Sequence, residues 1–471
     1  MNYLMIARKK AHTMGTIQSY EGEKVTILGA GTSGQGLAFL ARRLGAQVFV
    51  TEHKESLPDH VEKAFHENGI DWETGGHSER ALDTNVLVVS SGISPSVPII
   101  QKALGAGVPV MGELDFVVPH LQGKIIGVTG SNGKSTTTAL TGFVLEKCGY
   151  KAVAAGNIGK ALSCCAEENW DYIVIELSSF QLAWAHNLHS HIAIVTNLAP
   201  DHIDWHGSYE KYIEAKARLI HLQEPGQWAI VQNRDVRALE AHKRSHVASL
   251  FWEGQQEKLQ KTHAFIRMED KGAFFCTDGV DELLFRYEDT SLIGRHNLEN
   301  VAMTMAALAL GGMKCSAASH FVADFNPLSH RCTFVADIGG VRYIDDSKGT
   351  NVAASSTALS SIEGKKVVIL GGKGKGEDYG PLAEVVKKEA RVAIILGEEK
   401  TKILQALENI GFSNCIEVAD MEEAVRMAMK AALPGETVLL SPACTSWDMY
   451  SSYEKRGEHF QHLVKQYGGK R

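Results

Sequence analysis

Three segments of the chain share one pattern, in which an uninterrupted apolar run leads directly into glycines. These segments cover residues 25–34, 125–135 and 367–376. Runs of Val, Ile and Leu without polar alternation are typical of parallel strands that are buried on both faces of a sheet. A helical pattern follows each glycine turn, at residues 39–44, 136–148 and 382–389. The pattern therefore predicts three strand–turn–helix blocks and an α/β fold.

The boundaries between these blocks are marked less sharply. One seam is expected near residues 112–116 and another near residues 326–330. Between about residues 233 and 292 the long apolar runs give way to short alternating pieces. Those at 273–276 and 283–287 favour antiparallel strands. We therefore predict three domains, preceded by a flexible extension; the ranges are 1–20 for the extension and 21–113, 114–327 and 328–471 for the domains.

Composition narrows the class of protein. The chain has 471 residues, a net charge of −7, 44% hydrophobic and 22% charged residues, which is typical of a soluble globular protein. No long basic block is present, so a nucleic-acid partner is disfavoured. The eight cysteines form no C-x-x-C pair, which favours free thiols in a reducing compartment, and no apolar run is long enough to span a bilayer. We expect a cytoplasmic protein that binds no membrane.

The strongest chemical signal is the motif TGSNGKST at residues 129–136, which follows a predicted strand and opens a predicted helix. In such a loop the backbone N–H groups and the helix N-terminus favour phosphate. Lys134 would reach the β- and γ-phosphates, and the Ser135 hydroxyl would bind Mg²⁺. The strict phosphate-loop pattern has glycine at the position of Val128, so this motif is a variant.

A second glycine loop, GAGTSG at residues 29–34, is followed 18 residues after Gly34 by Glu52 at the end of the next predicted strand. This spacing is similar to a dinucleotide fingerprint, in which the acidic residue holds a ribose. Alone, the motif leaves three readings open: a tight turn without a ligand, an NAD(P) site, or a site for another phosphate-bearing nucleotide.

Four motifs, the phosphate loop among them, together carry a resemblance to a known family. They are TGSNGKS at 129–135, ELSSFQL at 176–182, DDSKGTN at 345–351 and LSPACTSWD at 440–448. In this order they resemble the Mur ligases, which add amino acids to a UDP-muramoyl precursor at the expense of ATP, and specifically the D-glutamate-adding branch. The resemblance covers roughly residues 24–467. It implies a Rossmann-like UDP-binding domain at 21–113, a P-loop ATPase-like domain with a mostly parallel sheet at 114–327, and a Rossmann-like amino-acid-binding domain at 328–471.

In the central domain, Glu176 ends an apolar strand at 171–176 and His202 closely follows another at 193–196. Open α/β sheets bind ligands at such strand ends. The resemblance implies four catalytic residues: Lys134, Glu176, His202 and Lys216. It also implies two Mg²⁺ ions held by Ser135, Glu176, His202 and a carbamylated Lys216.

The resemblance implies the substrate contacts as well. Asn297 and Asn300, spaced i, i+3 on a predicted helix, present amides suited to a purine edge. The ATP residues implied are Gly130, Asn132, Gly133, Lys134, Ser135, Thr136, Asn297, Asn300, Arg331 and Asp346. The UDP-substrate residues implied are Thr32, Ser33, Gly92, Asn157 and His202, and Ser91 stands where the family often has proline. The D-glutamate residues implied are Lys348, Thr350, Lys375, Ser446 and Tyr453.

The function expected from the resemblance is ATP-dependent addition of D-glutamate to UDP-N-acetylmuramoyl-L-alanine through an acyl phosphate, by a monomer with small-molecule partners only. Two alternatives stay open from the residues. One is a sister ligase or a folate-polyglutamate type of synthase. The other is a nucleotide-regulated binding protein without catalysis, which the presence of Lys134, Glu176, His202 and Lys216 disfavours.

Overall fold

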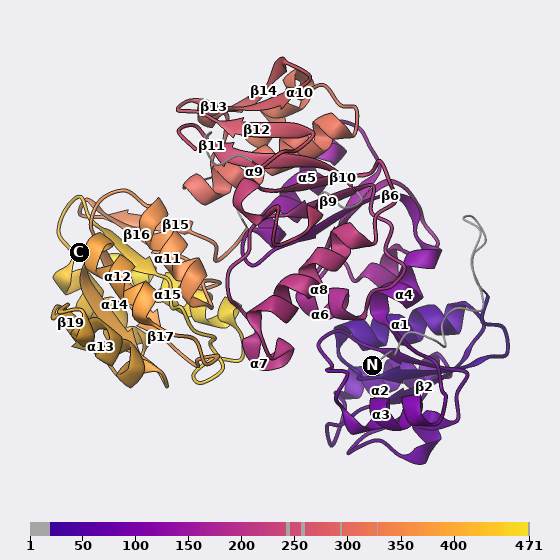
Figure 1. The fold of residues 1–471 in the computed structure, drawn as a ribbon. Coiled ribbons are helices and arrows are strands. Elements are labelled where there is room, and N and C mark those ends of the chain that lie inside the picture. The colour runs from indigo at the N-terminus through magenta and orange to yellow at the C-terminus, as the bar shows by residue number, and fades with distance from the viewer. Residues whose placement is uncertain (1–18, 242–244, 256–259, 293, 327, 470–471) are drawn as a thin grey trace.

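The computed structural model describes residues 19–241, 245–255, 260–292, 294–326 and 328–469. It contains three α/β units, coloured from indigo through magenta to yellow along the chain in Figure 1. The expected extension at 1–20 lies almost entirely outside the described residues. Tyr20, however, is buried against Phe116, with ring centroids 5.2 Å apart.

The N-terminal unit is a five-stranded parallel sheet of order β3-β2-β1-β4-β5. Helices connect the strands, as parallel neighbours require. The strands are β1 (Lys24–Leu28), β2 (Gln47–Thr51), β3 (Asp71–Glu73), β4 (Val86–Val89) and β5 (Val110–Gly112). The helices between them are α1 (Thr32–Arg43), α2 (Asp59–Glu67) and α3 (Pro98–Gly105).

The central unit has a nine-stranded sheet of order β14-β13-β12-β11-β10-β9-β6-β8-β7. Its strands are β6 (Gln122–Thr129), β7 (Ala152–Gly156), β8 (Asn169–Glu176), β9 (Ile192–Val195), β10 (Trp228–Gln232), β11 (His246–Trp252), β12 (Ala264–Met268), β13 (Gly272–Thr277) and β14 (Val280–Arg286). The sheet is parallel except for the pairs β12–β13 and β13–β14. The antiparallel strands expected from the alternating pieces are therefore present.

Both faces of the central sheet are covered, which explains the continuous apolar runs. Residues of α5 (Lys134–Lys147) and α9 (Arg295–Leu310) share one buried cluster with Ile126 and Val128 of β6. On the other face Ile125 packs in the cluster that includes Leu219 of α8 (Tyr209–His221). The remaining central helices are α4 (Glu113–Val117), α6 (Ser179–Trp184), α7 (Ile203–His206) and α10 (Cys315–Ala318).

The C-terminal unit has a six-stranded sheet of order β15-β16-β20-β17-β18-β19, parallel except for the β15–β16 pair. Its strands are β15 (Thr333–Ile338), β16 (Val341–Asp345), β17 (Lys366–Gly371), β18 (Ala390–Leu396), β19 (Cys415–Glu417) and β20 (Thr437–Leu440). Its helices are α11 (Val352–Ser361), α12 (Gly380–Glu389), α13 (Lys400–Asn409), α14 (Met421–Ala431) and α15 (Tyr453–Gly468). Separate buried clusters line its two faces. The predicted three-part α/β fold is confirmed.

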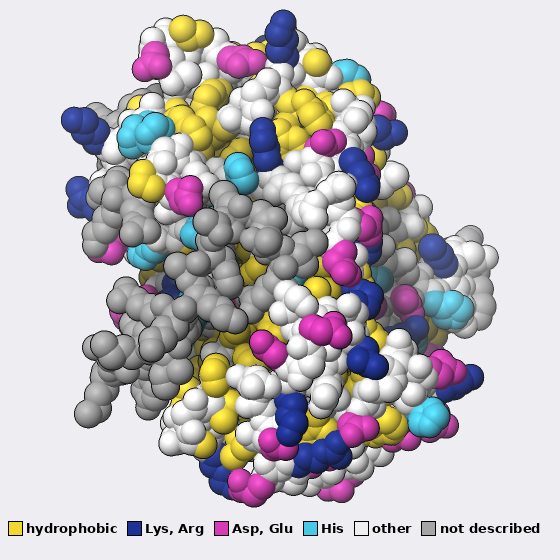
Figure 2. Space-filling view, turned by 90° about the vertical axis from the view of Figure 1, so that its right-hand side faces the viewer, with side chains coloured by type: hydrophobic (Ala, Val, Ile, Leu, Met, Phe, Trp, Pro, Cys, Tyr) yellow, Lys and Arg dark blue, Asp and Glu magenta, His cyan; other side chains and the backbone are white. Residues whose placement is uncertain are grey.

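The three units meet around the short helix α7, which Figure 1 shows between the C-terminal and N-terminal units. Trp205 of α7 donates through Nε1 to the Gly92 carbonyl of the N-terminal unit at 3.0 Å. On the face drawn in Figure 2, acidic and basic side chains are interspersed over the described surface. Among the described residues, no helix combines the length and the apolar character needed to cross a membrane.

Candidate active site

The phosphate loop between β6 and α5 is held in shape from two sides. Gly130 and Gly133 have φ values of 142° and 84°, a region that favours glycine. A side chain at Gly133 would also collide with the Asn300 amide. The Lys134 ammonium donates to the carbonyl oxygens of Gly130 and Ser131, both at 2.9 Å. Burial is the main cause that lowers the pKa of Lys134, partly offset by Glu176.

The carboxylate of Glu176 ends β8 beside this loop and is 2% exposed. Its Oε1 accepts a hydrogen bond from Asn157 Nδ2 at 3.0 Å. Its Oε2 is buried and has no hydrogen-bond partner among the described residues. A buried carboxylate oxygen without a donor is costly unless a cation completes it. Glu176 therefore fits a hard divalent ion such as Mg²⁺, which prefers oxygen ligands.

Within the described chain, no three His, Cys, Asp or Glu side chains form a cluster that could enclose a metal ion by themselves. Mg²⁺ commonly takes only one or two carboxylates and completes its shell with water and substrate phosphate, so this donor set still fits it. His202 stands nearby in a left-handed backbone conformation with φ 53°. Burial, together with Lys375 and Lys134, holds the pKa of His202 below its usual value, which keeps a lone pair available for a metal.

Lys216 comes from α8 and is 1% exposed. Its Nζ donates to the Gly130 carbonyl oxygen at 2.7 Å and lies 4.6 Å from the centroid of the Tyr212 ring. Burial and the neighbouring Lys134 lower the pKa of Lys216 well below its usual value. The buried amine thus has an unusually strong tendency to be neutral for a lysine.

Residues of the C-terminal unit lie opposite the phosphate loop and Glu176. Lys348 Nζ lies 3.8 Å from the centroid of the Tyr453 ring, a cation–π contact. Burial and Arg331 lower the pKa of Lys348 to about 8. Buried Arg456 of α15 holds together the loops that contain Ser347 and Cys444. Its guanidinium donates to the backbone carbonyls of Ser347 at 2.8 Å and Cys444 at 3.0 Å.

One cavity of about 460 Å³ lies between the central and C-terminal units. It brings together fourteen of the residues expected from the sequence: Asn132, Gly133, Lys134, Ser135, Asn157, Glu176, His202, Lys216, Arg331, Lys348, Thr350, Lys375, Ser446 and Tyr453. An adjoining cavity of about 70 Å³ is lined by Thr136, Asn297, Asn300 and Asp346. Asn132, Gly133, Arg331 and Lys348 border both spaces.

The glycine loop of the N-terminal unit borders a separate cavity of about 840 Å³. Gly92 and Ser91 line it, whereas Thr32 and Ser33 do not. Thr32 is exposed at the start of α1, and Ser33 Oγ lies 3.5 Å from Ser91 Oγ. Glu52 braces the loop, since its Oε2 accepts from the Ala30 N–H at 2.7 Å. A carboxylate engaged in this way supports the loop's shape.

Comparison with known proteins identifies relatives of this chain. Three family models match in chain order: "Mur ligase MurD-like, N-terminal domain" at residues 23–112, "Mur ligase middle domain" at 128–308, and "Mur ligase, glutamate ligase domain" at 330–444. A protein of Pelotomaculum thermopropionicum named UDP-N-acetylmuramoylalanine--D-glutamate ligase is 36% identical over 454 residues, covering 95% of this chain and 98% of its own. A protein of the same name from Bacteroides fragilis is 34% identical over 458 residues, covering 94% and 100%.

The chain belongs to the Mur ligase family.

Solved structures of other Mur ligases share the fold. UDP-N-acetylmuramate-alanine ligase MurC from Thermotoga maritima superposes with a TM-score of 0.58 at 17% identity, covering 95% of this chain and 100% of that one. The MurF ligase of the same organism, in complex with ADP, gives 0.58 at 16% identity, with 98% of both chains covered. Mur ligases are ATP-dependent, and Mg²⁺ is general for the family.

Sequence reasoning missed several residues of this Mur ligase's cavity. Asp201, Asn351 and Tyr212 line it, and Ser131 binds both Tyr212 Oη at 2.9 Å and the Ala199 carbonyl at 2.8 Å. A signal for Asp201 existed, because it precedes His202 after the same predicted strand. A signal for Asn351 existed as well. It is the last residue of the DDSKGTN motif, and its position before a helix is typical of an N-cap.

Proposed function

We propose that this Mur ligase adds D-glutamate to UDP-N-acetylmuramoyl-L-alanine in the synthesis of peptidoglycan precursors, converting ATP to ADP and phosphate. The observation that carries the proposal is the single cavity in which the phosphate loop of the central domain faces Lys348, Thr350 and Lys375 of the C-terminal domain. The choice of D-glutamate rests on the curated relatives, which are 33–36% identical over nearly their whole length and bear that activity in their names.

The reaction has two steps. First, a carboxylate oxygen of the L-alanyl group accepts the γ-phosphoryl of ATP, which gives an acyl phosphate and ADP. Next, the amine nitrogen of D-glutamate attacks the activated carbonyl carbon, phosphate leaves with the electron pair of the C–O bond, and the nitrogen loses a proton. Phosphoryl transfer depends mainly on positioning and on neutralising charge. Lys134 and Arg331 supply cations to the cavity from two different domains.

Ser135, Glu176, His202 and Lys216 are the residues that would hold two Mg²⁺ ions. The unpartnered Oε2 of Glu176 supports this assignment. When bound, Mg²⁺ neutralises phosphate oxygens and orients them. The protein's own contribution is to orient the Glu176 carboxylate through the hydrogen bond from Asn157 and to hold His202 in a fixed backbone conformation.

Lys216 is proposed to react with CO₂, so that its amine becomes a carbamate. The amine nitrogen forms the new bond to the carbon of CO₂, the π electron pair of one C=O bond moves to its oxygen, and the nitrogen releases one proton. Only the neutral amine is nucleophilic, and burial lowers the pKa of Lys216 in that direction. The product is an anion, which would attract a metal ion and the nearby Lys134 ammonium. A protonated Lys216 would instead repel both.

The UDP group and the adenosine would bind in different cavities. The cavity of the N-terminal domain would take the uracil end of the UDP group at Gly92 and the glycine loop. The diphosphate would extend beyond this cavity to Thr32 and Ser33 at the start of α1, while Asn157 and His202 approach the muramoyl end. Asn297, Asn300, Thr136 and Asp346 would receive the adenosine. We further propose a cytoplasmic monomer whose partners are small molecules, without nucleic acid or membrane.

The decisive experiment is a coupled ADP-release assay with UDP-N-acetylmuramoyl-L-alanine and one amino acid at a time. We expect release to require both that substrate and D-glutamate, with Lys134→Ala as the inactive control. Preferred release with L-lysine, meso-diaminopimelate or L-alanine would assign the chain to a sister ligase instead. No release with any amine, despite nucleotide binding, would favour a protein without catalysis.

A further inference from the structure

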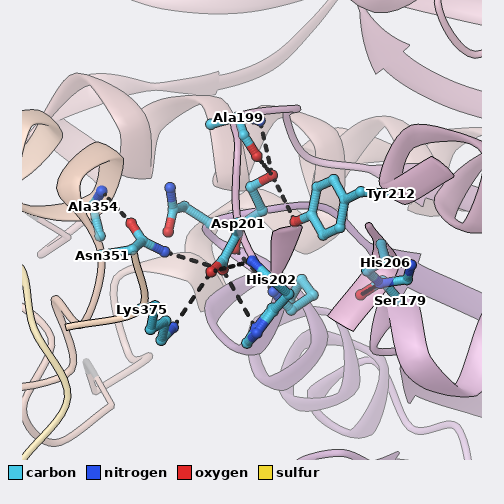
Figure 3. Close-up of polar contacts among 12 residues, drawn as sticks. Ser179, Ala199, Asp201, His202, His206, Tyr212, Asn351, Ala354 and Lys375 are labelled. Atoms are coloured by element: carbon cyan, nitrogen blue, oxygen red, sulfur yellow. Dashed lines mark hydrogen bonds and ion pairs between the residues drawn. The ribbon is translucent and has the colours of Figure 1, made fainter. Parts of the chain in front are cut away.

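Asp201 is a buried carboxylate that joins two domains. It follows β9 in the central domain and is 6% exposed. Its Oδ1 lies 3.3 Å from Lys375 Nζ, and its Oδ2 accepts from Asn351 Nδ2 at 3.2 Å. Both partners belong to the C-terminal domain. Figure 3 shows Lys375 and Asn351 pointing toward Asp201 from one side, with His202 beside it.

The segment before Asp201 is attached to the phosphate loop. The Asn132 N–H donates to Asn197 Oδ1 at 3.0 Å, and the Ala199 N–H donates to Ser131 Oγ at 2.8 Å. One end of residues 197–201 is therefore fixed to the nucleotide loop, while its other end holds the C-terminal domain. A continuous set of hydrogen bonds links the two substrate regions.

Lys375 needs such an anchor. It lies in a loop where Gly371, Gly372 and Gly376 all have positive φ, and a lysine side chain is long and flexible. Among the described residues, Asp201 is the hydrogen-bond partner of its ammonium. An ammonium has three donors, so one bond to Asp201 leaves others free for a substrate carboxylate.

Asn351 fixes the second attachment. Its Oδ1 accepts from the Ala354 N–H at 2.7 Å and caps α11, which leaves Nδ2 directed at Asp201. Because the amide is engaged at both ends, its orientation is determined. The neighbouring Thr350, another cavity-lining residue, is thereby held at a set distance from the central domain.

We propose that Asp201 is a positioning residue that docks the C-terminal domain on the phosphate loop and orients Lys375 toward the carboxylate of the incoming amino acid. This inference rests on the proposed function, because it takes D-glutamate as that amino acid. Asp201 acts through Lys375 and Asn351 and forms no bond with the reacting atoms.

Three variants separate the contacts. Asp201→Asn keeps the size and an oxygen for Asn351 but removes the charge opposite Lys375. Asn351→Ser keeps a good helix cap while deleting the Nδ2 contact. Glu167→Gln is the matched control, since Glu167 pairs with Arg43 at 3.0 Å between the central and N-terminal domains, at an exposed position.

We expect Asp201→Asn to raise the KM for D-glutamate at least about tenfold, because the ammonium loses its fixed position, and to leave the KM for ATP near that of the parent. In a Lys375→Ala background the same substitution should add little, since residues that act through each other are not additive. Equal effects in both backgrounds, or a raised Mg²⁺ requirement as the main change, would overturn the proposal by pointing to His202.

Small-angle X-ray scattering tests the docking without relying on activity. We expect the radius of gyration to increase in the Asp201→Asn, Asn351→Ser double variant and to stay at the parental value in Glu167→Gln. Unchanged compactness of the double variant would overturn the docking role. If the parent prefers another amino acid, the proposed function fails, while this measurement still decides whether Asp201 holds the domains together.

Discussion

Arg331 Nη2 donates a hydrogen bond to Ser135 Oγ at 2.6 Å, across the boundary between the C-terminal and central domains. The hydroxyl belongs to the phosphate loop, and the guanidinium borders both the larger cavity and the adjoining one that Asn297 and Asn300 line. A cation carried by one domain thus reaches the phosphate site of another. A single side chain therefore couples the position of the C-terminal domain to the positive charge beside the phosphate loop.

Arg331→Ala should lower kcat for ADP release by at least about 10²-fold, because a preorganised donor at a transferring phosphoryl group is removed. Arg331→Lys should recover only part of this loss, since lysine lacks the planar fork of donors. Arg342→Ala, an exposed arginine on β16, is the control in the same domain. A kcat within a few-fold of the parent in Arg331→Ala would remove Arg331 from the phosphate site.

Lys134→Ala should abolish ligation, with a loss of at least about 10²-fold in kcat, because its ammonium is the loop's cation at the phosphates. Lys147→Ala, in the last turn of the same helix, serves as the matched control and should behave like the parent. The measurement is steady-state ADP release at saturating substrates. Near-parental turnover of Lys134→Ala would contradict the phosphate-loop assignment.

If Lys216 is carbamylated, we expect one spectroscopic result and one result in activity assays. Protein equilibrated with ¹³C-bicarbonate should show one enriched carbamate resonance that is missing in Lys216→Ala and present in Lys211→Ala, an exposed lysine on the same helix. Lys216→Ala should be nearly inactive, and a short-chain carboxylate added in solution should partly restore turnover. A fully active parent that carries a plain amine at this position would refute the carbamate.

Asp346 should make the stability of the fold depend on pH. Burial raises the pKa of Asp346 from 3.8 to about 7, so between these values the folded state holds a proton that the unfolded state has lost. Stability then falls as pH rises across this window and levels off above it. In thermal unfolding, Asp346→Asn should gain Tm relative to the parent between pH 5 and pH 8. Asp337→Asn, at an exposed site, should show no such gain.

The sequence predicted those features that depend on local pattern. The strand before Gly130 was readable because Ile125, Ile126 and Val128 are buried in clusters on the two faces of the sheet. The antiparallel strands β13 and β14 could be predicted from the short alternating pieces at 273–276 and 283–287. The role of Asp201 was not, because its partners Lys375 and Asn351 lie 174 and 150 residues away in the chain. Likewise, the position of Thr32 and Ser33 outside the N-terminal cavity depends on how α1 begins, which a motif does not specify.

Two lysines, Lys373 and Lys375, share the loop at residues 371–376. D-Glutamate must keep its amine free to attack, so the protein should hold its two carboxylates with cations and with hydroxyl or backbone donors. Lys375 lines the cavity and is held at Asp201, whereas Lys373 is exposed and its backbone pairs with Thr445 at 3.0 Å.

Lys375→Ala should therefore raise the KM for D-glutamate strongly and leave the KM for ATP little changed. Removing one member of a hydrogen-bonded charge pair costs on the order of 2–5 kcal/mol, which corresponds to a large loss of affinity. Lys373→Ala is the matched variant and should stay near the parent in both constants. If Lys373→Ala shows the larger effect, the contact belongs to Lys373 and the chemistry is unchanged. If neither substitution alters D-glutamate kinetics, the amino acid does not bind at this loop, and its carboxylates must be held by Lys348, Thr350 and Ser446 alone.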